Sequence, residues 1–368
     1  MRFPEFSGEW NKYTINDLAT VVGGGTPDTT VKSYWGGDIQ WFTPSEIGKN
    51  KYVDFSKRTI TRDGLDNSSA KLLPLHTILL SSRATVGECS IASNECTTNQ
   101  GFQSLIAKQC NIDFLYYLIQ TKKKDLIRNA CGSTFLEISA NEIRKIKVAV
   151  PVQNEQEQIA KLLSLIDERI ATQNKIIEDL KKLKSAISLK MLHSDSWKQF
   201  KIKDIASIGR GRVISSVEIS QQDNPLYPVY SSQTSNEGIM GYLDNFMFEG
   251  EYINWTTDGA NAGTVFYRDG KFNCTNVCGL LKLGDEFDTY FVSLVLAEAT
   301  KKYVSTNLAN PKLMNNTMGS IQIRLPKLKE QKRISIAFRK LRELLEVHNS
   351  LLTEYSRLKQ YLLSQMFI

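Results

Sequence analysis

The sequence predicts an α+β protein in which two similar mixed α/β domains are joined by two long helices, as a pseudo-twofold internal repeat. The first observation is the repeat itself, because Asp113 to Leu192 matches Asp288 to Phe367 at a constant shift of 175 residues. The second is a long charged, Leu- and Ile-rich stretch that ends each copy. The third is a set of short apolar runs between loops rich in Gly, Asn and Ser. A repeat of this length indicates two copies of one domain-plus-helix unit.

These observations divide the chain into four parts. We expect a domain at 1–150, a helix at 151–194, a second domain at 195–325 and a second helix at 326–368. A chain of 368 residues is long enough for two domains that each bury a core. The first copy is about 12 residues longer, and the extra length lies between Gly25 and Pro74.

The stretches Glu155–Leu192 and Glu330–Phe367 have the pattern of long helices. Apolar residues recur every three or four positions, and neither Gly nor Pro interrupts them. Each stretch covers 38 residues, roughly 57 Å at the rise of an α-helix. The narrow apolar seam favours a coiled coil, and because the intervening domain lets the chain return, we expect the two helices to pair antiparallel. The alternative is two independent amphipathic helices, each lying on its own domain.

The globular parts carry both strand and helix patterns. The apolar runs Thr77–Leu80, Gln103–Ile106 and Ile146–Val150 predict strands. Stretches near Phe114–Arg128 and Tyr290–Tyr303 predict helices. The pattern is therefore that of a mixed, loop-rich α+β domain.

Composition argues against several classes of protein. No run approaches the ~18 apolar residues of a membrane span, and the N-terminus lacks the apolar core of a signal peptide. The six cysteines show no CxxC spacing, and only three histidines exist, so we expect no metal site. Free buried thiols in a reducing cytosol are the better interpretation, which predicts a cytoplasmic protein.

The charge balance permits a nucleic-acid partner without demanding one. The net charge is +7 and the isoelectric point is about 8.9. Neither domain is strongly basic. DNA would therefore be bound through local clusters, or with help from a partner that carries more positive charge.

Motifs of catalysis are incomplete. The glycine turns Gly23-Gly24-Gly25 and Gly209-Arg210-Gly211 lack the strand–GxGxxG–helix context of a cofactor site, and no phosphate loop occurs. Asp223-Asn224-Pro225-Leu226-Tyr227 is similar to the Asn-Pro-Pro-Tyr loop of adenine methyltransferases, but Leu226 replaces the second Pro. A turn before the strand Tyr227–Tyr230 explains this segment better. We expect no catalytic residue in the chain.

Polar loops recur between the predicted strands. Ser81–Gly87 aligns with Thr257–Gly263, and Thr98–Gly101 aligns with Thr275–Cys278. Short polar side chains on Gly-rich turns suit contacts with base edges and phosphates, although tight turns alone need the same residues. The polar candidates for DNA binding are Ser82, Arg83, Thr85, Gln233, Asp258 and Asn261.

Basic residues add a second group of candidates. A basic cluster ends the predicted helix of the first domain, and Lys301-Lys302 takes a similar place in the second. A lysine run is often only a solvated helix face, but its approximate recurrence favours phosphate contact. The basic candidates are Lys122, Lys123, Lys124, Arg128, Arg210, Arg212, Lys301, Lys302 and Lys312.

Several motifs are distinctive in combination and cover nearly the whole chain. In the first half they are Phe3-Pro4-Glu5-Phe6, Gly24-Gly25-Thr26-Pro27, Tyr34-Trp35-Gly36-Gly37-Asp38-Ile39, Leu79 to Gly87 and Thr98 to Phe102. In the second half they are Tyr227 to Tyr230, Thr257 to Gly263 and Asn310 to Asn315, and Pro151/Glu155-Gln156 and Pro326/Glu330-Gln331 close the halves. With these motifs the chain resembles the specificity subunit of a type I restriction–modification system.

The resemblance implies a function and a set of partners. In that family each target-recognition domain reads one half of a split double-stranded DNA sequence. The helices hold the halves apart and dock two modification subunits that methylate adenine, and two restriction subunits join for cleavage. The resemblance implies no cofactor in this chain, with S-adenosylmethionine in the modification subunits, and no membrane partner. The helix residues expected to bind partners are Ile159, Leu162, Ile166, Leu180, Phe338, Leu341, Leu345 and Leu352.

Two other functions stay open at the level of sequence. A stand-alone DNA methyltransferase with a fused recognition domain would need the missing cofactor loop. A coiled-coil adaptor that never touches DNA would show no sequence-selective binding, even with modification subunits present. The DNA target itself is not readable from the sequence.

Overall fold

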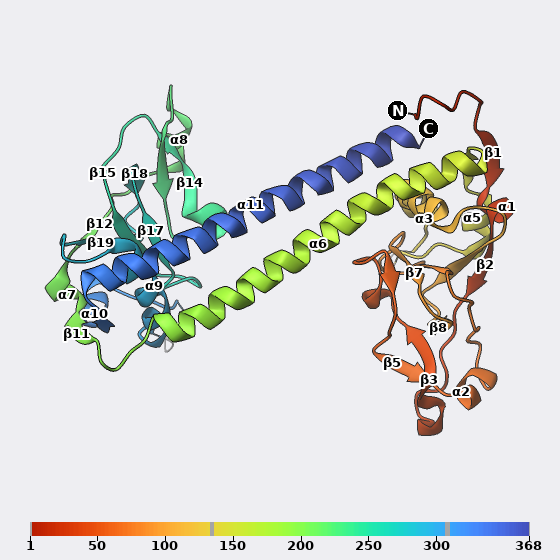
Figure 1. Ribbon diagram of the computed structural model, residues 1–368, viewed down its shortest axis with the longest axis horizontal. Coiled ribbons are helices and arrows are strands. Elements are labelled where there is room, and N and C mark those ends of the chain that lie inside the picture. Colours follow the sequence, from red (N-terminus) through yellow and green to blue (C-terminus); the bar gives the residue numbers. More distant parts are fainter. Residues whose placement is uncertain (1, 133–135, 306–309, 368) are drawn as a thin grey trace. The chain divides into compact units, whose positions relative to one another are not determined.

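The computed structural model describes residues 2–132, 136–305 and 310–367 (Figure 1). The chain divides into two compact units, Met1–Lys175 with Asn349–Ile368, and Ile176–His348. We call them unit 1 and unit 2. Each unit contains one globular part together with a portion of each long helix. The expected ranges 1–150, 195–325 and 326–368 include positions 1, 133–135, 306–309 and 368, which lie outside the described residues.

Unit 1 is built on two sheets and a strand pair. The larger sheet has the strand order β2-β9-β6-β7-β4, the smaller has the order β5-β3-β8, and β1 pairs with β10. The strands are β1 Asn11–Thr14, β2 Ala19–Gly23, β3 Trp35–Phe42, β4 Tyr52–Val53, β5 Arg58–Ile60, β6 Ile78–Leu80, β7 Cys89–Ala92, β8 Cys96–Thr98, β9 Gln103–Ala107 and β10 Lys147–Val150. The shorter helices are α1 Ile15–Leu18, α2 Arg62–Asp66, α3 Ile112–Thr121, α4 Lys123–Arg128 and α5 Ala140–Lys145, with 3₁₀ turns η1 Lys32–Tyr34 and η2 Pro44–Glu46.

Unit 2 repeats this plan with other strand lengths. Its sheets have the orders β12-β19-β16-β17 and β14-β13-β18-β15, and β11 pairs with β20. The strands are β11 Lys198–Lys201, β12 Ala206–Arg210, β13 Tyr227–Tyr230, β14 Ile239–Leu243, β15 Phe248–Glu249, β16 Tyr252–Thr256, β17 Val265–Arg268, β18 Lys271–Cys274, β19 Cys278–Leu283 and β20 Gln322–Leu325. The helices are α7 Ile202–Ile205, α8 Ser216–Ser220, α9 Thr289–Ala299 and α10 Asn315–Ser320, with 3₁₀ turns η3 Ser235–Gly238 and η4 Thr300–Lys302.

The two long helices are α6 Gln153–Met191 and α11 Leu328–Met366, each of 39 residues. In unit 1 the end of α11 packs on the beginning of α6, where Lys359 and Asp167 form an ion pair of 2.7 Å. In unit 2 the end of α6 shares a hydrophobic cluster with the beginning of α11, through Met191 and Phe338. Each unit thus pairs the start of one helix with the end of the other, which is the antiparallel arrangement.

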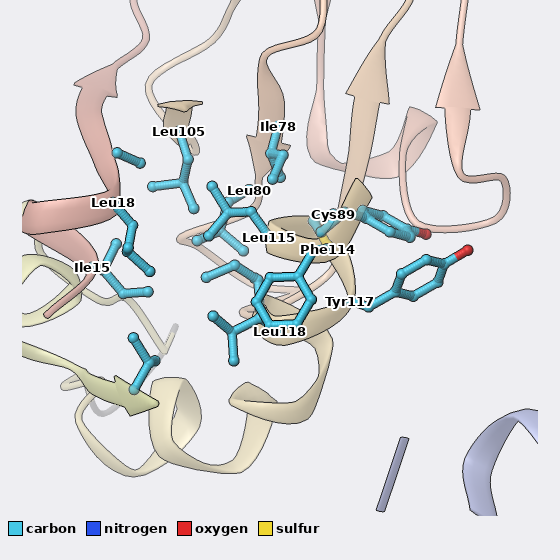
Figure 2. Close-up of a cluster of buried hydrophobic side chains, with 14 of the residues drawn as sticks. Ile15, Leu18, Ile78, Leu80, Cys89, Leu105, Phe114, Leu115, Tyr117 and Leu118 are labelled. Atoms are coloured by element: carbon cyan, nitrogen blue, oxygen red, sulfur yellow. The ribbon is translucent and has the colours of Figure 1, made fainter. Parts of the chain in front are cut away.

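Both helices also pack on the globular parts. Figure 2 shows the core of unit 1, in which Phe114, Leu115 and Leu118 of α3 meet strands of the larger sheet. Ile159 and Leu163 of α6 belong to the same cluster. The helices therefore form a coiled-coil pair and at the same time complete the domain cores.

The predicted strands at Thr77–Leu80, Gln103–Ile106, Ile146–Val150 and Tyr227–Tyr230 are confirmed by β6, β9, β10 and β13. The helical stretch predicted near Phe114–Arg128 is confirmed as two helices, because α3 and α4 are separated at Lys122, whose φ of −89° and ψ of 6° leave the helical region. The stretch Tyr290–Tyr303 likewise ends its α-helix at Ala299 and continues as a 3₁₀ turn. Among the described helices, none is both long and apolar enough to cross a membrane.

Candidate nucleic-acid interface

The loop between β6 and β7 of unit 1, Ser81–Gly87, is held by hydrogen bonds on three sides. The backbone N–H of Ser82 donates to the carbonyl of Gly101 at 2.8 Å, and the carbonyl of Ser82 accepts from Ile138 at 2.9 Å. Within the loop, the hydroxyls of Ser81 and Thr85 lie 2.9 Å apart. Ala84 has a φ of 62°, a left-handed conformation that is unfavourable for any residue with a Cβ. The loop is therefore a fixed platform that exposes Arg83, Ala84 and Thr85.

The corresponding loop of unit 2 is braced in the same way. Leu313 donates to the carbonyl of Thr257 at 2.8 Å, and Gly259 donates to the carbonyl of Pro311 at 3.1 Å. In unit 1 the matching bonds run from Ile138 to Ser82 and from Ala84 to Leu136. The two loops therefore correspond at a shift of 175 as far as Gly259, so Thr257 matches Ser82 and Gly259 matches Ala84. This corrects the sequence alignment of Ser81 with Thr257, which is displaced by one residue in this part of the loop.

The corrected register shows an exchange of charge between the loops. Arg83 forms a β-bridge with Glu137, and their side chains lie 3.7 Å apart. The matching bridge in unit 2 joins Asp258 to Lys312. In unit 1 the loop thus carries a basic residue and the segment that braces it carries an acidic one. In unit 2 the loop carries the acidic residue and the bracing segment the basic one. Base-edge contacts depend on where donors and acceptors lie, so the two platforms present different patterns on one backbone frame.

Glycines in the two turn motifs are required by a close backbone crossing. A Cβ on Gly24 would lie 2.0 Å from the carbonyl oxygen of Asn99, and a Cβ on Gly211 would lie 1.7 Å from that of Cys274. The segment after β2 in unit 1 and the segment after β12 in unit 2 therefore each cross directly against the backbone at the second polar loop. This explains the glycine motifs without a cofactor.

A small hollow beside the first platform brings in residues that the prediction missed. It has a volume of about 240 Å³ and is lined by Pro44, Arg83, Ala84, Asn99, Gln100 and Gly101. Gln100 is exposed, and its side-chain oxygen accepts from the hydroxyl of Thr26. Asn99 instead uses its side-chain oxygen to accept from Gly101 at 2.9 Å. The alignment of Thr98–Gly101 with Thr275–Cys278 was the signal that pointed here.

One polar candidate, Ser82, is corrected by its burial, and two further candidates, Gln233 and Arg212, have partners within the chain. The side chain of Ser82 is fully buried, so its hydroxyl does not reach the surface. The side-chain amide of Gln233 donates to the carbonyl of Ile239 within its own turn. Arg212 is bound by both oxygens of Glu218, which offsets its charge and keeps its pKa raised through that hydrogen bond. Asn261 is exposed, as predicted for a residue that reads DNA.

The basic candidates lie beside the polar loops in each unit. A Cβ on Gly87 would touch the side chain of Lys123, and the hydroxyl of Thr300, the first residue of η4, donates to the carbonyl of Gly263 at 2.9 Å. Lys123 pairs with Glu88, and Lys124 is exposed. The remaining members of these clusters are half-buried Lys122 and the exposed Arg128, Lys301, Lys302 and Lys312. Arg210 donates to the side-chain oxygen of Asn315 at 2.9 Å and so braces the second domain.

The residues predicted to bind partners lie mostly inside the chain. Ile159 and Ile166 are buried in the core of unit 1, with Leu162 packed against it, and Phe338 is buried in the core of unit 2. Leu341 is also buried, whereas Leu180, Leu345 and Leu352 are half-buried. The prediction is therefore wrong for the buried residues, because the apolar seam serves the chain's own packing. The exposed apolar side chains of these helices lie on other faces and include Leu165, Ile336, Leu344, Val347, Leu351, Leu358 and Tyr361.

Four of the six thiols are buried as expected, whereas Cys110 is half-buried and Cys131 is exposed, which corrects the prediction for these two. Burial raises the pKa of Cys89, Cys96 and Cys110 to about 12, so these groups stay protonated at neutral pH. In the ranges that the structure describes, no three His, Cys, Asp or Glu side chains gather as metal ligands would.

Comparisons with known proteins agree on one family. The profile described as "Type I restriction modification DNA specificity domain" matches residues 7–182 and 194–355. The specificity subunit of the type I restriction enzyme MjaIX from Methanocaldococcus jannaschii is 39% identical over 183 residues, which cover 48% of this chain and 42% of that protein. The MpnII specificity subunit from Mycoplasma pneumoniae is 42% identical over 147 residues, which cover 39% of this chain and 44% of that protein. The chain thus spans less than half the length of these two relatives.

Solved structures share the fold. The S subunit of a type I restriction–modification system from M. genitalium matches with a TM-score of 0.71 and 18% identity, over 100% of this chain and 99% of that one. A chain from a study of complex assembly in a type I system matches with a TM-score of 0.58 and 13% identity, over 98% of both chains. The repeated domain-plus-helix architecture and the family profile lead to the same conclusion: the chain belongs to the type I restriction–modification DNA specificity family.

Proposed function

We propose that this chain reads a bipartite DNA target, with one half-site for each of the domains 1–150 and 195–325. The observation that carries the proposal is the pair of matching platforms. Both use the same backbone hydrogen bonds, yet Arg83 and Glu137 in one are replaced by Asp258 and Lys312 in the other. A shared frame with different exposed side chains is what two related but non-identical half-sites require.

Within each platform the roles divide by position. Arg83 and Gln100 border the hollow of the first domain, and Arg83 is held by Glu137, so these two side chains suit direct base contact. Asn261 is the corresponding reader in the second domain. Lys122, Lys124 and Arg128, together with Lys301 and Lys302, suit phosphates, which carry affinity rather than sequence.

The helices α6 and α11 serve in the proposal as a ruler between half-sites. Each of the 39-residue helices is about 58 Å long. Duplex DNA rises about 3.4 Å per base pair, so this length caps the separation near ~17 base pairs. Binding to one face of the duplex favours centres about one to one and a half turns apart.

The chain is further proposed to work in the cytoplasm with two adenine-methylating modification subunits, which hold S-adenosylmethionine, and with two restriction subunits. The exposed apolar residues of the helices supply docking surfaces: Leu344 and Val347 of α11 in unit 2, and Leu165, Leu358 and Tyr361 in unit 1. Isolated exposed leucines are ordinary, but several on one helix suit a partner helix.

Methylation sequencing of host adenines, with and without this gene and in the presence of modification subunits, tests the proposal. The expected result is a split motif whose methylation disappears with the gene. A contiguous palindromic motif would contradict two different half-sites. Methyl transfer by the purified chain alone would instead support a stand-alone methyltransferase.

A further inference from the structure

We propose that each recognition domain is keyed to its own long helix by a junction of charged residues whose polarity is reversed between the two units. The functional part of this inference, a fixed order of the two half-sites, rests on the proposed function. The keying itself rests on contacts inside each unit. We call these contacts junction 1 and junction 2.

Junction 1 centres on Lys51, which follows β3 and its 3₁₀ turn in the domain of unit 1. The ammonium group of Lys51 donates to the hydroxyl of Ser164 on α6 at 2.6 Å and pairs with Asp113 at 2.7 Å. It also lies 4.9 Å from the ring centre of Tyr117. The side chain of Lys51 is only 9% exposed, so its charge depends on these partners.

Tyr117 and Asp167 continue junction 1 toward the helices. Figure 2 shows the hydroxyl of Tyr117 directed away from the hydrophobic cluster that holds its ring. This hydroxyl donates to Asp167 of α6 at 2.7 Å, and Asp167 also pairs with Lys359 of α11 at 2.7 Å. The α6 side of junction 1 therefore accepts hydrogen bonds through the hydroxyl of Ser164 and the carboxylate of Asp167, and the domain side donates them through Lys51 and Tyr117. Asp113, which belongs to the same domain, balances the charge of Lys51.

Junction 2 has the opposite polarity. On α11, Arg342 pairs with Glu237 at 3.2 Å, and Arg339 pairs with Glu251 at 3.4 Å. The guanidinium of Arg339 also donates to the hydroxyl of Tyr267 at 3.1 Å and lies 4.4 Å from the ring centre of Tyr290. Here the helix supplies the cations and the domain supplies the carboxylates.

The two junctions occupy equivalent places. Ser164 and Asp167 are 175 positions before Arg339 and Arg342, the shift that relates the start of α6 to the start of α11. Lys51 follows the 3₁₀ turn after β3, and Glu237 lies in the 3₁₀ turn after β13. A domain placed on the wrong helix would therefore put Lys51 against Arg339 and Arg342, or Glu237 against Asp167.

The burial of the charged side chains determines which junction discriminates more strongly between the two domains. Placing a buried charge such as Lys51 beside a like charge is strongly unfavourable, even though its ion-pair partner Asp113 belongs to the same domain. The pairs of junction 2 are largely exposed, at 40% and 46% for Arg339 and Glu251, so their attraction is weaker. Junction 1 is therefore the main determinant, and it accepts a domain with lysine in the loop after its third strand.

The test is a charge exchange in the full chain. Making α6 resemble α11 with Ser164→Arg and Asp167→Arg should increase the unfolded fraction of unit 1 at least roughly tenfold. Adding Lys51→Glu and Lys359→Glu, with Asp113→Asn to remove the carboxylate that pairs with Lys51, should recover most of that stability. Lys49→Glu, at an exposed position in the same loop, serves as the control and should recover nothing. Denaturant unfolding, with proteolysis to localise the change, gives the measurement.

Two outcomes would overturn the keying: a helix variant as stable as the parent, or a fivefold variant no more stable than the helix variant. A chain with domain 195–325 in both places provides a second measurement, since it should dock on α6 only when Ser164→Arg and Asp167→Arg are present. Methylation sequencing of the compensated variant separates the two proposals. Recovered stability with an unchanged split motif supports both, whereas recovered stability with no split motif supports the keying and defeats the proposed function.

Discussion

Gln156 of α6 and Gln331 of α11 stand 175 positions apart and make the same two hydrogen bonds. Gln156 donates to the carbonyl of Pro151 at 2.9 Å and accepts from the backbone of Asn111 at 3.0 Å. Gln331 donates to the carbonyl of Pro326 at 2.9 Å and accepts from the backbone of Asp288 at 2.9 Å. Each glutamine thus ties the start of a long helix to the first turn of the main helix of its domain.

Removing either glutamine should destabilise its unit. Gln156→Ala or Gln331→Ala leaves a buried carbonyl and a partly buried N–H without partners, so we expect a decrease of about 1–3 kcal/mol in the free energy of unfolding. Gln→Glu keeps the acceptor but removes the donor, and should fall between. Denaturant unfolding measures the decrease, with the exposed Gln158→Ala as the control. Stabilities of Gln156→Ala and Gln156→Glu equal to that of the parent would show that the bonds contribute nothing.

Phosphate contacts and base contacts should separate in binding experiments with the assembled methyltransferase. Replacing Lys122, Lys124 and Arg128 by Gln should weaken binding to all sequences alike and reduce the salt slope by about one for each phosphate that is no longer neutralised. Lys123 is left intact because it pairs with Glu88 and helps to hold the loop, whereas Arg128, which pairs with Asp125 of its own helix, is highly exposed. Binding titrations at several salt concentrations give the measurement. A changed sequence preference with unchanged affinity would show that these residues read bases.

Changing a platform residue should have the opposite effect. Arg83→Ala should relax the preference at one base pair of the first half-site by about 1–3 kcal/mol, and Asn261→Ala should act on the second half-site alone. Methylation sequencing of each variant shows which half of the motif is altered. Disappearance of both halves together would point to unfolding rather than to readout.

Much of the fold could be predicted from the sequence. The spacing of apolar residues, about 3.6 in helices and 2 in strands, is a local pattern, and the 175-residue shift shows that the pattern occurs twice. The strands β6, β9, β10 and β13 followed from short apolar runs. Seam residues such as Ile159 and Phe338 were assigned to partners because a periodic pattern shows that a helix face is covered, not what covers it. Ser82 was grouped with its exposed neighbours for a similar reason. The burial of Ser82 depends on contacts with Gly101 and Ile138, which are distant in sequence. No local sequence pattern indicated that Glu137 would lie beside Arg83.

Docking of modification subunits should depend on the exposed side of α11 rather than on the buried seam. Leu344→Asp with Val347→Asp places charges on exposed positions, so the chain should fold normally while the complex with modification subunits weakens at least tenfold. Native mass measurement of the co-expressed complex, expected as one chain with two modification subunits, shows the weakening. Ser350→Asp is a matched control at an exposed polar position of α11. An unchanged assembly would place docking elsewhere.

The ruler role of the helices is testable by shortening. Deleting one heptad from both α6 and α11 keeps the apolar seam in phase but removes about 10 Å of length. The methylated motif should then lose about three base pairs of its central spacer, or methylation should cease. Sequencing of host adenines distinguishes these results. An unchanged spacer would show that the helices do not set the distance.

Alkaline pH should destabilise unit 1 through Tyr116 and Tyr117. Burial, aided by the negative charge of Asp167, raises the pKa of both hydroxyls far above the ordinary value of about 10. Both tyrosines therefore stay protonated in the folded chain when they ionise in the unfolded chain, so the unfolded state binds fewer protons above about pH 10. Stability is complete below that pH and falls above it, by up to about 1.4 kcal/mol per pH unit for each tyrosine.

Replacing both tyrosines by Phe lowers stability at neutral pH, because the bond from Tyr117 to Asp167 is removed, but should flatten the decline above pH 10. Denaturant unfolding between pH 8 and about 11 measures how the stability of the parent and that of the double variant change with pH. The control is Tyr361→Phe, at an exposed position of α11. Parallel slopes in the parent and the double variant would mean that other groups govern the alkaline limb.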